Sequence, residues 1–163
     1  MRILAIDPGY TQSAFCETLD GMPCWSGMSD NAAVRALLID VFGRPSVHRP
    51  DHLAIEMVAS YGMAVGVEVF ETVRWIGRFQ EAYESRGGAV RLIFRKDVKL
   101  HLCGDTRAKD SNIRQAIIDR FGPGKDKAIG RKAAPGPLYG IKADVWSALA
   151  VAITAESARG AHA

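Results

Sequence analysis

The sequence has few cysteines, and their spacing excludes two common classes of small protein. Cys16, Cys24 and Cys103 are odd in number and form no Cys-x-x-Cys pair. Disulfide scaffolds and structural zinc sites need more cysteines or a closer spacing, so reduced thiols are the better interpretation. The sequence also lacks an apolar run of the ~20 residues that cross a bilayer, and its first residues show no signal-peptide pattern. We therefore expect a cytoplasmic protein with no membrane contact.

The charges are distributed unevenly along a chain that is expected to form one domain over 1–163. Its 163 residues are 48% hydrophobic and 24% charged, which is enough to bury a core. Residues 91–142 hold thirteen lysines and arginines against five aspartates, a net charge of +8, whereas the remaining residues hold eight against thirteen acids, a net charge of −5. This basic region predicts a polyanionic partner such as nucleic acid, with a solvated surface as an equal alternative.

Hydrophobic patterns and turn residues predict an α/β fold. Strand patterns occupy 2–7, 12–18, 23–28, 52–58 and 89–94. Helical patterns occupy 29–42, 64–86, 96–104, 109–122 and 141–158. The segment at about 122–140 is rich in glycine, proline and basic residues, so we expect a mobile basic loop.

Two of the expected strands end in an acid after nearly the same apolar sequence. Ile-Leu-Ala-Ile leads to Asp7 and His-Leu-Ala-Ile leads to Glu56, while Asp144 opens the last helix. An ionised carboxylate at a buried strand end is unfavourable unless it is paired or binds a metal. If the two strands are neighbours and the helix packs across them, the three acids converge and Mg²⁺ or Mn²⁺ would neutralise them. Paired ions of this kind support phosphodiester cleavage. The alternative is that Asp7 begins a turn and Asp144 caps a helix.

Four blocks, in this order, resemble the RuvC-type Holliday junction resolvases of the ribonuclease H-like superfamily. They are the strand through Asp7-Pro8-Gly9, the Ala-Ile-Glu at 54–56, the pattern Val98-Lys99, Gly104 and Ala108-Lys109, and the closing Ala-Asp-Val-Trp-Ser-Ala-Leu-Ala at 143–150. The resemblance implies a mixed five-stranded sheet flanked by α-helices, in the order β-β-β-α-β-α-β-α. It also implies a homodimer that binds branched DNA at a four-way junction and makes paired symmetric nicks with Mg²⁺ or Mn²⁺, leaving 5′-phosphates. The compact form with a long basic loop is similar to phage or prophage versions.

The resemblance assigns the catalytic and metal-binding roles to Asp7, Glu56 and Asp144. One position departs from the pattern, because Ser147 stands where the family's closing helix carries a second acid. The neutral hydroxyl of Ser147 could hold a metal-bound water but cannot replace the missing charge. We therefore expect weaker metal binding and, as an alternative, an attenuated enzyme.

Other residues are expected to contact DNA. Lys99 and Lys109 correspond to basic residues that face DNA in the family. Tyr61 lies in the loop where the family carries an aromatic residue that stacks near the junction centre, a role that Met63 could take instead. Further phosphate-contact candidates, chosen by their charge, are Arg107, Arg114, Lys125, Lys127, Arg131 and Lys132. The alternative for each is a solvated surface residue.

Two other functions and one interface remain open at this point. The first alternative is a junction-binding protein with weak or no cleavage, suggested by Ser147. The second is a related nuclease that acts on other branched DNA or on RNA–DNA hybrids, which the Val-Lys, Gly, Ala-Lys block argues against. The dimer contact is expected on the part of the 64–86 helix outside its core face, which holds Val67, Phe70, Arg74, Trp75 and Arg78.

Overall fold

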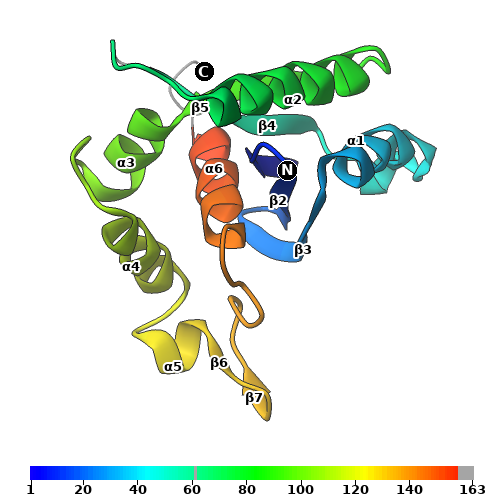
Figure 1. Ribbon diagram of the computed structural model, residues 1–163. Helices are drawn as coiled ribbons and strands as arrows, with labels where there is room; N and C mark the ends of the chain where they lie inside the picture. Colours follow the sequence, from blue (N-terminus) through cyan, green and yellow to red (C-terminus); the bar gives the residue numbers. More distant parts are fainter. Residues whose placement is uncertain (61, 158–163) are drawn as a thin grey trace.

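The computed structural model describes residues 1–60 and 62–157. Five strands form one mixed sheet in the order β3-β2-β1-β4-β5 (Figure 1). The strands are β1 (Arg2–Pro8), β2 (Gln12–Leu19), β3 (Met22–Asp30), β4 (His52–Met57) and β5 (Val90–Phe94). The first three form an antiparallel meander, and β4 and β5 run parallel to β1. The expected mixed sheet is therefore confirmed, with β1 at its centre.

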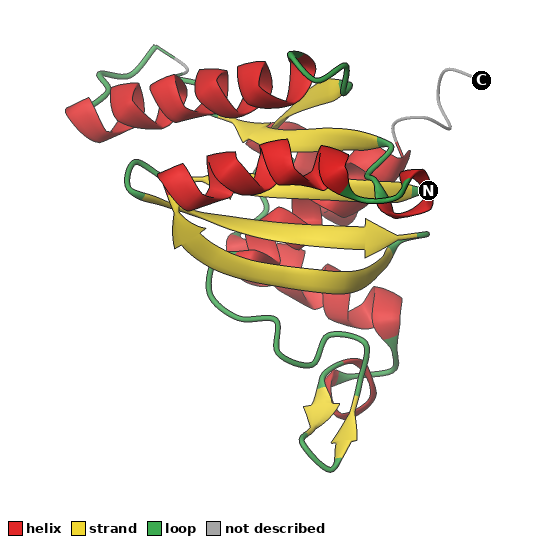
Figure 2. Cartoon of the chain, turned by 90° about the vertical axis from the view of Figure 1, so that its right-hand side faces the viewer, coloured by secondary structure: helices red, strands yellow, loops and turns green. Residues whose placement is uncertain are grey.

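Helices cover both faces of the sheet (Figure 2). One face carries α1 (Asn31–Asp40) and α2 (Val67–Glu84); the other carries α6 (Val145–Ser157), with α3 (Arg95–Cys103) and α4 (Asp110–Phe121) beside it. Side chains alternate along β1, so Leu4 and Ile6 join the core under α1 and α2, whereas Ile3 and Ala5 join the core under α6. The α6 helix is almost entirely buried and rich in alanine, which suits a helix lying close against a sheet. None of the helices in the described ranges is long and apolar enough to cross a bilayer.

Most expected elements are present, with shifted ends. The Asp30 carboxylate accepts a hydrogen bond from the Ala33 backbone N–H at 2.9 Å and caps α1, as its position predicts. The helix expected over 64–86 begins only at Val67, with Gly66 as its extended N-cap. The helix expected over 141–158 begins at Val145, because Ala143 has a φ of +47° and cannot be part of a right-handed helix. Short 3₁₀ turns, Val41–Gly43 and Ser46–His48, link α1 to β4.

The segment 122–140 contains structure that its composition did not predict. It holds a helical turn, α5 (Lys125–Ala128), and a two-residue hairpin of β6 (Gly130–Arg131) and β7 (Ala134–Pro135). The Leu138 N–H donates to the Ala128 carbonyl at 2.8 Å, and both of these residues are fully buried. The packing joins the segment to the core under α6, and its mobility stays a prediction.

Candidate active site

The acids singled out in the sequence lie at the end of the sheet where the neighbouring strands β1 and β4 terminate. In the parallel pair β1–β4, Ile6 is opposite Ile55, so Asp7 and Glu56 follow at the same end of two neighbouring strands. The α6 helix packs across β1 and β4. Asp144 precedes its first turn, and the Asp144 carbonyl accepts hydrogen bonds from the N–H groups of Ser147 and Ala148 at 3.0 and 3.1 Å. The expected adjacency of the strands and the crossing of the helix are both confirmed.

The turn after Asp7 is braced by a close backbone approach and by side-chain hydrogen bonds. A Cβ on Gly9 would lie 2.4 Å from the Gln12 carbonyl oxygen, so the close approach of the two segments requires glycine. The Asn31 amide donates to the Gly9 carbonyl at 2.9 Å, and the Ser13 hydroxyl donates to the Asn31 side-chain oxygen at 2.6 Å. This network connects the start of α1 to the turn beside Asp7.

The surroundings of Asp7 and Glu56 disfavour the ionised forms of these two side chains. Burial, followed by the charges of Glu56 and Asp144, raises the pKa of Asp7 to about 7, against the smaller opposing effects of Arg95 and of a hydrogen bond with Ser147. Burial likewise raises the pKa of Glu56, which the Arg95 guanidinium partly offsets. These shifts indicate that Glu56, Asp144, Arg95 and Ser147 all act on Asp7 and that the site has an excess of negative charge once its carboxylates ionise.

Arg95 is the site residue that sequence reasoning missed. It opens α3 directly after β5, whose Phe94 is paired with Met57, the neighbour of Glu56. Its Nη1 lies 3.4 Å from Glu56 Oε2 and 3.4 Å from Ser147 Oγ, and its Nη2 donates to Asp110 Oδ1 at 2.5 Å. The one sequence signal for Arg95 was its position as a basic residue directly after β5, the next strand along the chain after the Glu56 strand β4.

Three cavities adjoin Arg95. One, of about 310 Å³, is lined by Asp7, Glu56 and the start of α2. A second, of about 360 Å³, is lined by Asp144 and Ser147 together with Asp110 and Arg114. A third, of about 340 Å³, is lined by Lys96, Lys99 and Thr106. Two of the expected DNA-contact residues, Lys99 and Arg114, therefore line cavities next to the acids.

The remaining expected contact residues lie on other segments. Lys109 is the N-cap of α4, and exposed Arg107 pairs with Asp105 at 3.4 Å. Lys125, Lys127, Arg131 and Lys132 belong to the segment of α5, β6 and the hairpin tip, which Figure 1 shows at the opposite end of the molecule from α2. Tyr61 lies outside the described residues. For the other residues of this group, all of them described, no hydrogen bond or ion pair to Asp7, Glu56 or Asp144 is present.

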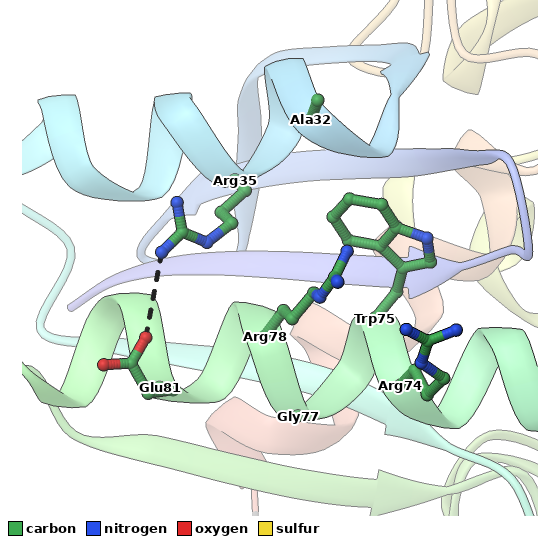
Figure 3. Close-up of a pocket in the computed structure, with 7 residues that line it drawn as sticks. All are labelled: Ala32, Arg35, Arg74, Trp75, Gly77, Arg78 and Glu81. Carbon is green, nitrogen blue, oxygen red and sulfur yellow. Dashed lines mark ion pairs between the residues drawn. The ribbon is translucent and has the colours of Figure 1, made fainter.

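A larger groove of about 570 Å³ lies between α1 and α2, away from the acids (Figure 3). Arg35 pairs there with Glu81 at 3.8 Å, and the Arg78 guanidinium lies over the Trp75 ring at 4.7 Å. Three arginines and one glutamate line the groove, so it keeps an excess of positive charge. Its residues belong to the same α2 surface that the sequence suggested as a dimer contact.

The donor atoms at the acid edge suit a divalent cation, although not as a preformed cage. In residues 1–60 and 62–157, no three histidine, cysteine or acidic side chains lie close enough together to hold a metal ion. Asp7 and Glu56 are nevertheless an interacting carboxylate pair with Asp144 nearby, and carboxylate oxygens are the ligands that Mg²⁺ and Mn²⁺ prefer. A cation there would relieve the repulsion from Glu56 and Asp144 that adds to burial in raising the pKa of Asp7.

The sequence matches no protein-family model and no curated protein. Its fold does have solved relatives. The structure of RuvC from Thermus thermophilus superposes with a TM-score of 0.71 at 20% identity, covering 99% of this chain and 97% of that one. This chain has the RuvC fold. The same T. thermophilus protein in complex with a Holliday junction substrate gives a TM-score of 0.71 at 21% identity, covering 99% and 96% of the two chains. The RuvC comparison confirms the expected ribonuclease H-like architecture over nearly the whole chain.

Proposed function

We propose that this protein is a divalent-metal-dependent endonuclease that resolves four-way DNA junctions. The observation that carries the proposal is the position of Asp7, Glu56 and Asp144 at one edge of a sheet with the RuvC fold, beside cavities that basic residues line. T. thermophilus RuvC, which shares this fold, has been solved with a Holliday junction substrate. The basic region at 91–142 supplies charge for a DNA backbone.

The reaction we propose is hydrolysis of one phosphodiester in each of two strands. A water oxygen attacks the phosphorus, the bond from phosphorus to the 3′ oxygen breaks, and the 3′ oxygen takes up a proton, leaving a 5′-phosphate and a 3′-hydroxyl. Asp7, Glu56 and Asp144 would hold Mg²⁺ or Mn²⁺, which when bound activates the water and neutralises charge on the phosphate. The ionised form of Asp7 is the one that binds a cation, so its raised pKa makes both metal binding and activity increase as the pH rises through about 7.

Paired nicks require two active sites, and a homodimer would supply them. The outer surface of α2 exposes apolar side chains, with Val67 77% and Phe70 60% exposed. The groove that holds Trp75 and Arg78 lies further along the same helix. An apolar surface of this kind on a helix suits an isologous contact with a second copy of the chain.

A labelled synthetic four-way junction in Mg²⁺ and then in Mn²⁺ tests the proposal, with linear duplex and Asp7→Asn protein as controls. Symmetric nicks on the junction alone, absent with the variant, are expected. Cleavage of an RNA–DNA hybrid instead of the junction would indicate the alternative nuclease.

One specific observation favours a second candidate, a protein that binds junctions without cutting them. Ser147 is neutral and contacts Arg95, so the site has less negative charge for holding a metal than a fourth acid at position 147 would give it. This candidate predicts a junction that shifts in a gel in both metals and stays uncut.

A further inference from the structure

The charge around Ser147 is reversed relative to the pattern that the resemblance implies. An acid at this position would add a negative charge beside Asp144. The chain instead has a hydroxyl, and the Arg95 Nη1 lies 3.4 Å from it and 3.4 Å from Glu56. A fixed positive group therefore stands at the part of the site where a second cation would need an acid.

The guanidinium is held in this place by rigid elements. Arg95 is the first residue of α3, and its Nη2 is anchored by the Asp110 carboxylate at the start of α4. The Asp110 side chain is 79% exposed, whereas that of Arg95 is 28% exposed. The exposed Asp110 carboxylate orients the Arg95 guanidinium, and an incoming anion can displace this carboxylate.

Arg95 also lies where a phosphate would enter. It lines the cavity of Asp7 and Glu56, the cavity of Asp144 and Ser147, and the cavity of Lys99. A phosphate in either cavity that contains the acids, or in the basic cavity of Lys96 and Lys99, meets the guanidinium. Arginine binds phosphate through two parallel N–H donors, a geometry that a lysine cannot reproduce.

We infer that Arg95 is a phosphate-binding residue of this site and that, together with Ser147, it takes the place of a second divalent cation. Each protomer then binds a single Mg²⁺ or Mn²⁺. The phosphate-binding part rests on the proposed function, because it takes DNA as the ligand. The single-cation part rests on the charges of the site alone.

Counting bound Mn²⁺ tests the single-cation part without any DNA. Electron paramagnetic resonance of free Mn²⁺ measures the ions bound per protomer in the wild type, Arg95→Gln, Ser147→Asp and the double variant. We expect one ion in the wild type and in each single variant, because in Ser147→Asp the new acid pairs with Arg95. The double variant is expected to bind two. Two ions in the wild type, or a second ion in Ser147→Asp with Arg95 intact, would overturn the inference.

Junction binding in EDTA tests the phosphate-binding part without metal or cleavage. Arg95→Gln is expected to weaken binding of a four-way junction about tenfold. The matched control, Arg86→Gln, removes an equal charge beyond the far end of α2, about 27 Å of helix away from the end that lines the Asp7 cavity. The control should change the affinity less than about twofold, and Arg95→Lys should recover only part of the loss.

Equal losses for Arg95→Gln and Arg86→Gln would refute the phosphate role. Circular dichroism of each variant excludes misfolding, and Arg95→Lys provides a second variant that keeps the charge. If the wild type binds no junction at all, the proposed function fails, and the Mn²⁺ count still decides the single-cation part. The two failures are therefore distinguishable.

Discussion

Replacing Asp7 by asparagine should stabilise the metal-free protein while it abolishes cleavage. The pKa of Asp7 is raised from its ordinary 3.8 to about 7, chiefly by burial and by the charges of Glu56 and Asp144. Between these two values the folded protein keeps a proton that the unfolded chain has lost, so stability falls as the pH rises through this window. An increase of this size corresponds to about 4 kcal/mol of lost stability above pH 7. The neutral amide of the variant avoids that loss.

Urea unfolding in EDTA measures this difference at both ends of the window. At about pH 8 the variant should be more stable than the wild type by up to about 4 kcal/mol, and at about pH 4 the two should agree within about 1 kcal/mol. Adding Mn²⁺ at high pH should stabilise the wild type more than the variant, because the variant has lost one of the three carboxylates that would hold the cation. A variant no more stable than the wild type at high pH would refute the account of Asp7 as a buried, repelled carboxylate.

Three further predictions test the fold and the DNA surface. The Glu17 carboxylate accepts hydrogen bonds from Arg2 and Arg44 at 2.5 and 2.7 Å, and its side chain is 3% exposed. Glu17→Gln should therefore lower the free energy of unfolding by about 3 kcal/mol. A loss below about 1 kcal/mol in urea unfolding would contradict this prediction. The buried Leu138 amide should exchange with deuterium more slowly than that of Lys132 at the hairpin tip, whereas rapid exchange at both would support the mobile loop expected from composition. Replacing Lys125 and Lys127 by glutamine should reduce the slope of log affinity against log salt by about 2, and an unchanged slope would exclude them as phosphate contacts.

Local patterns were sufficient to predict the scaffold of the site. The strands ending at Asp7 and Glu56 are short apolar runs stopped by turn residues, and their pairing follows from the parallel arrangement that a crossover between them permits. The closing helix was recognisable from its apolar length, although its start was misplaced by four residues because Ala143 takes a left-handed conformation that alanine rarely adopts. Element type was thus predictable, while the ends depended on single backbone angles.

Contacts between distant segments were not predictable from local patterns. Glu17 interrupts the buried strand β2, and nothing near it indicates that Arg2 and Arg44, 15 and 27 residues away, would neutralise it. The structure in 122–140 was missed for a similar reason, since glycine and proline indicate turns equally in a mobile loop and in a tightly packed one. In that segment, Gly136 approaches the Lys127 carbonyl so closely that a Cβ would lie 2.3 Å from its oxygen.

Arg95 shows why a departure from a motif has to be interpreted in three dimensions. From the sequence, Ser147 predicts only a lost negative charge and a weaker metal site. In the structure, the residue that contacts Ser147 comes from 52 positions earlier in the chain and carries a positive charge. A site that loses an acid and gains a guanidinium at the same point has less negative charge there to hold a second divalent ion, and the exposed Asp110 offsets only part of that change. The attenuated enzyme that Ser147 suggested as an alternative thus has a competing explanation, and the Mn²⁺ count in the four proteins separates a weakened two-ion site from a site built for one.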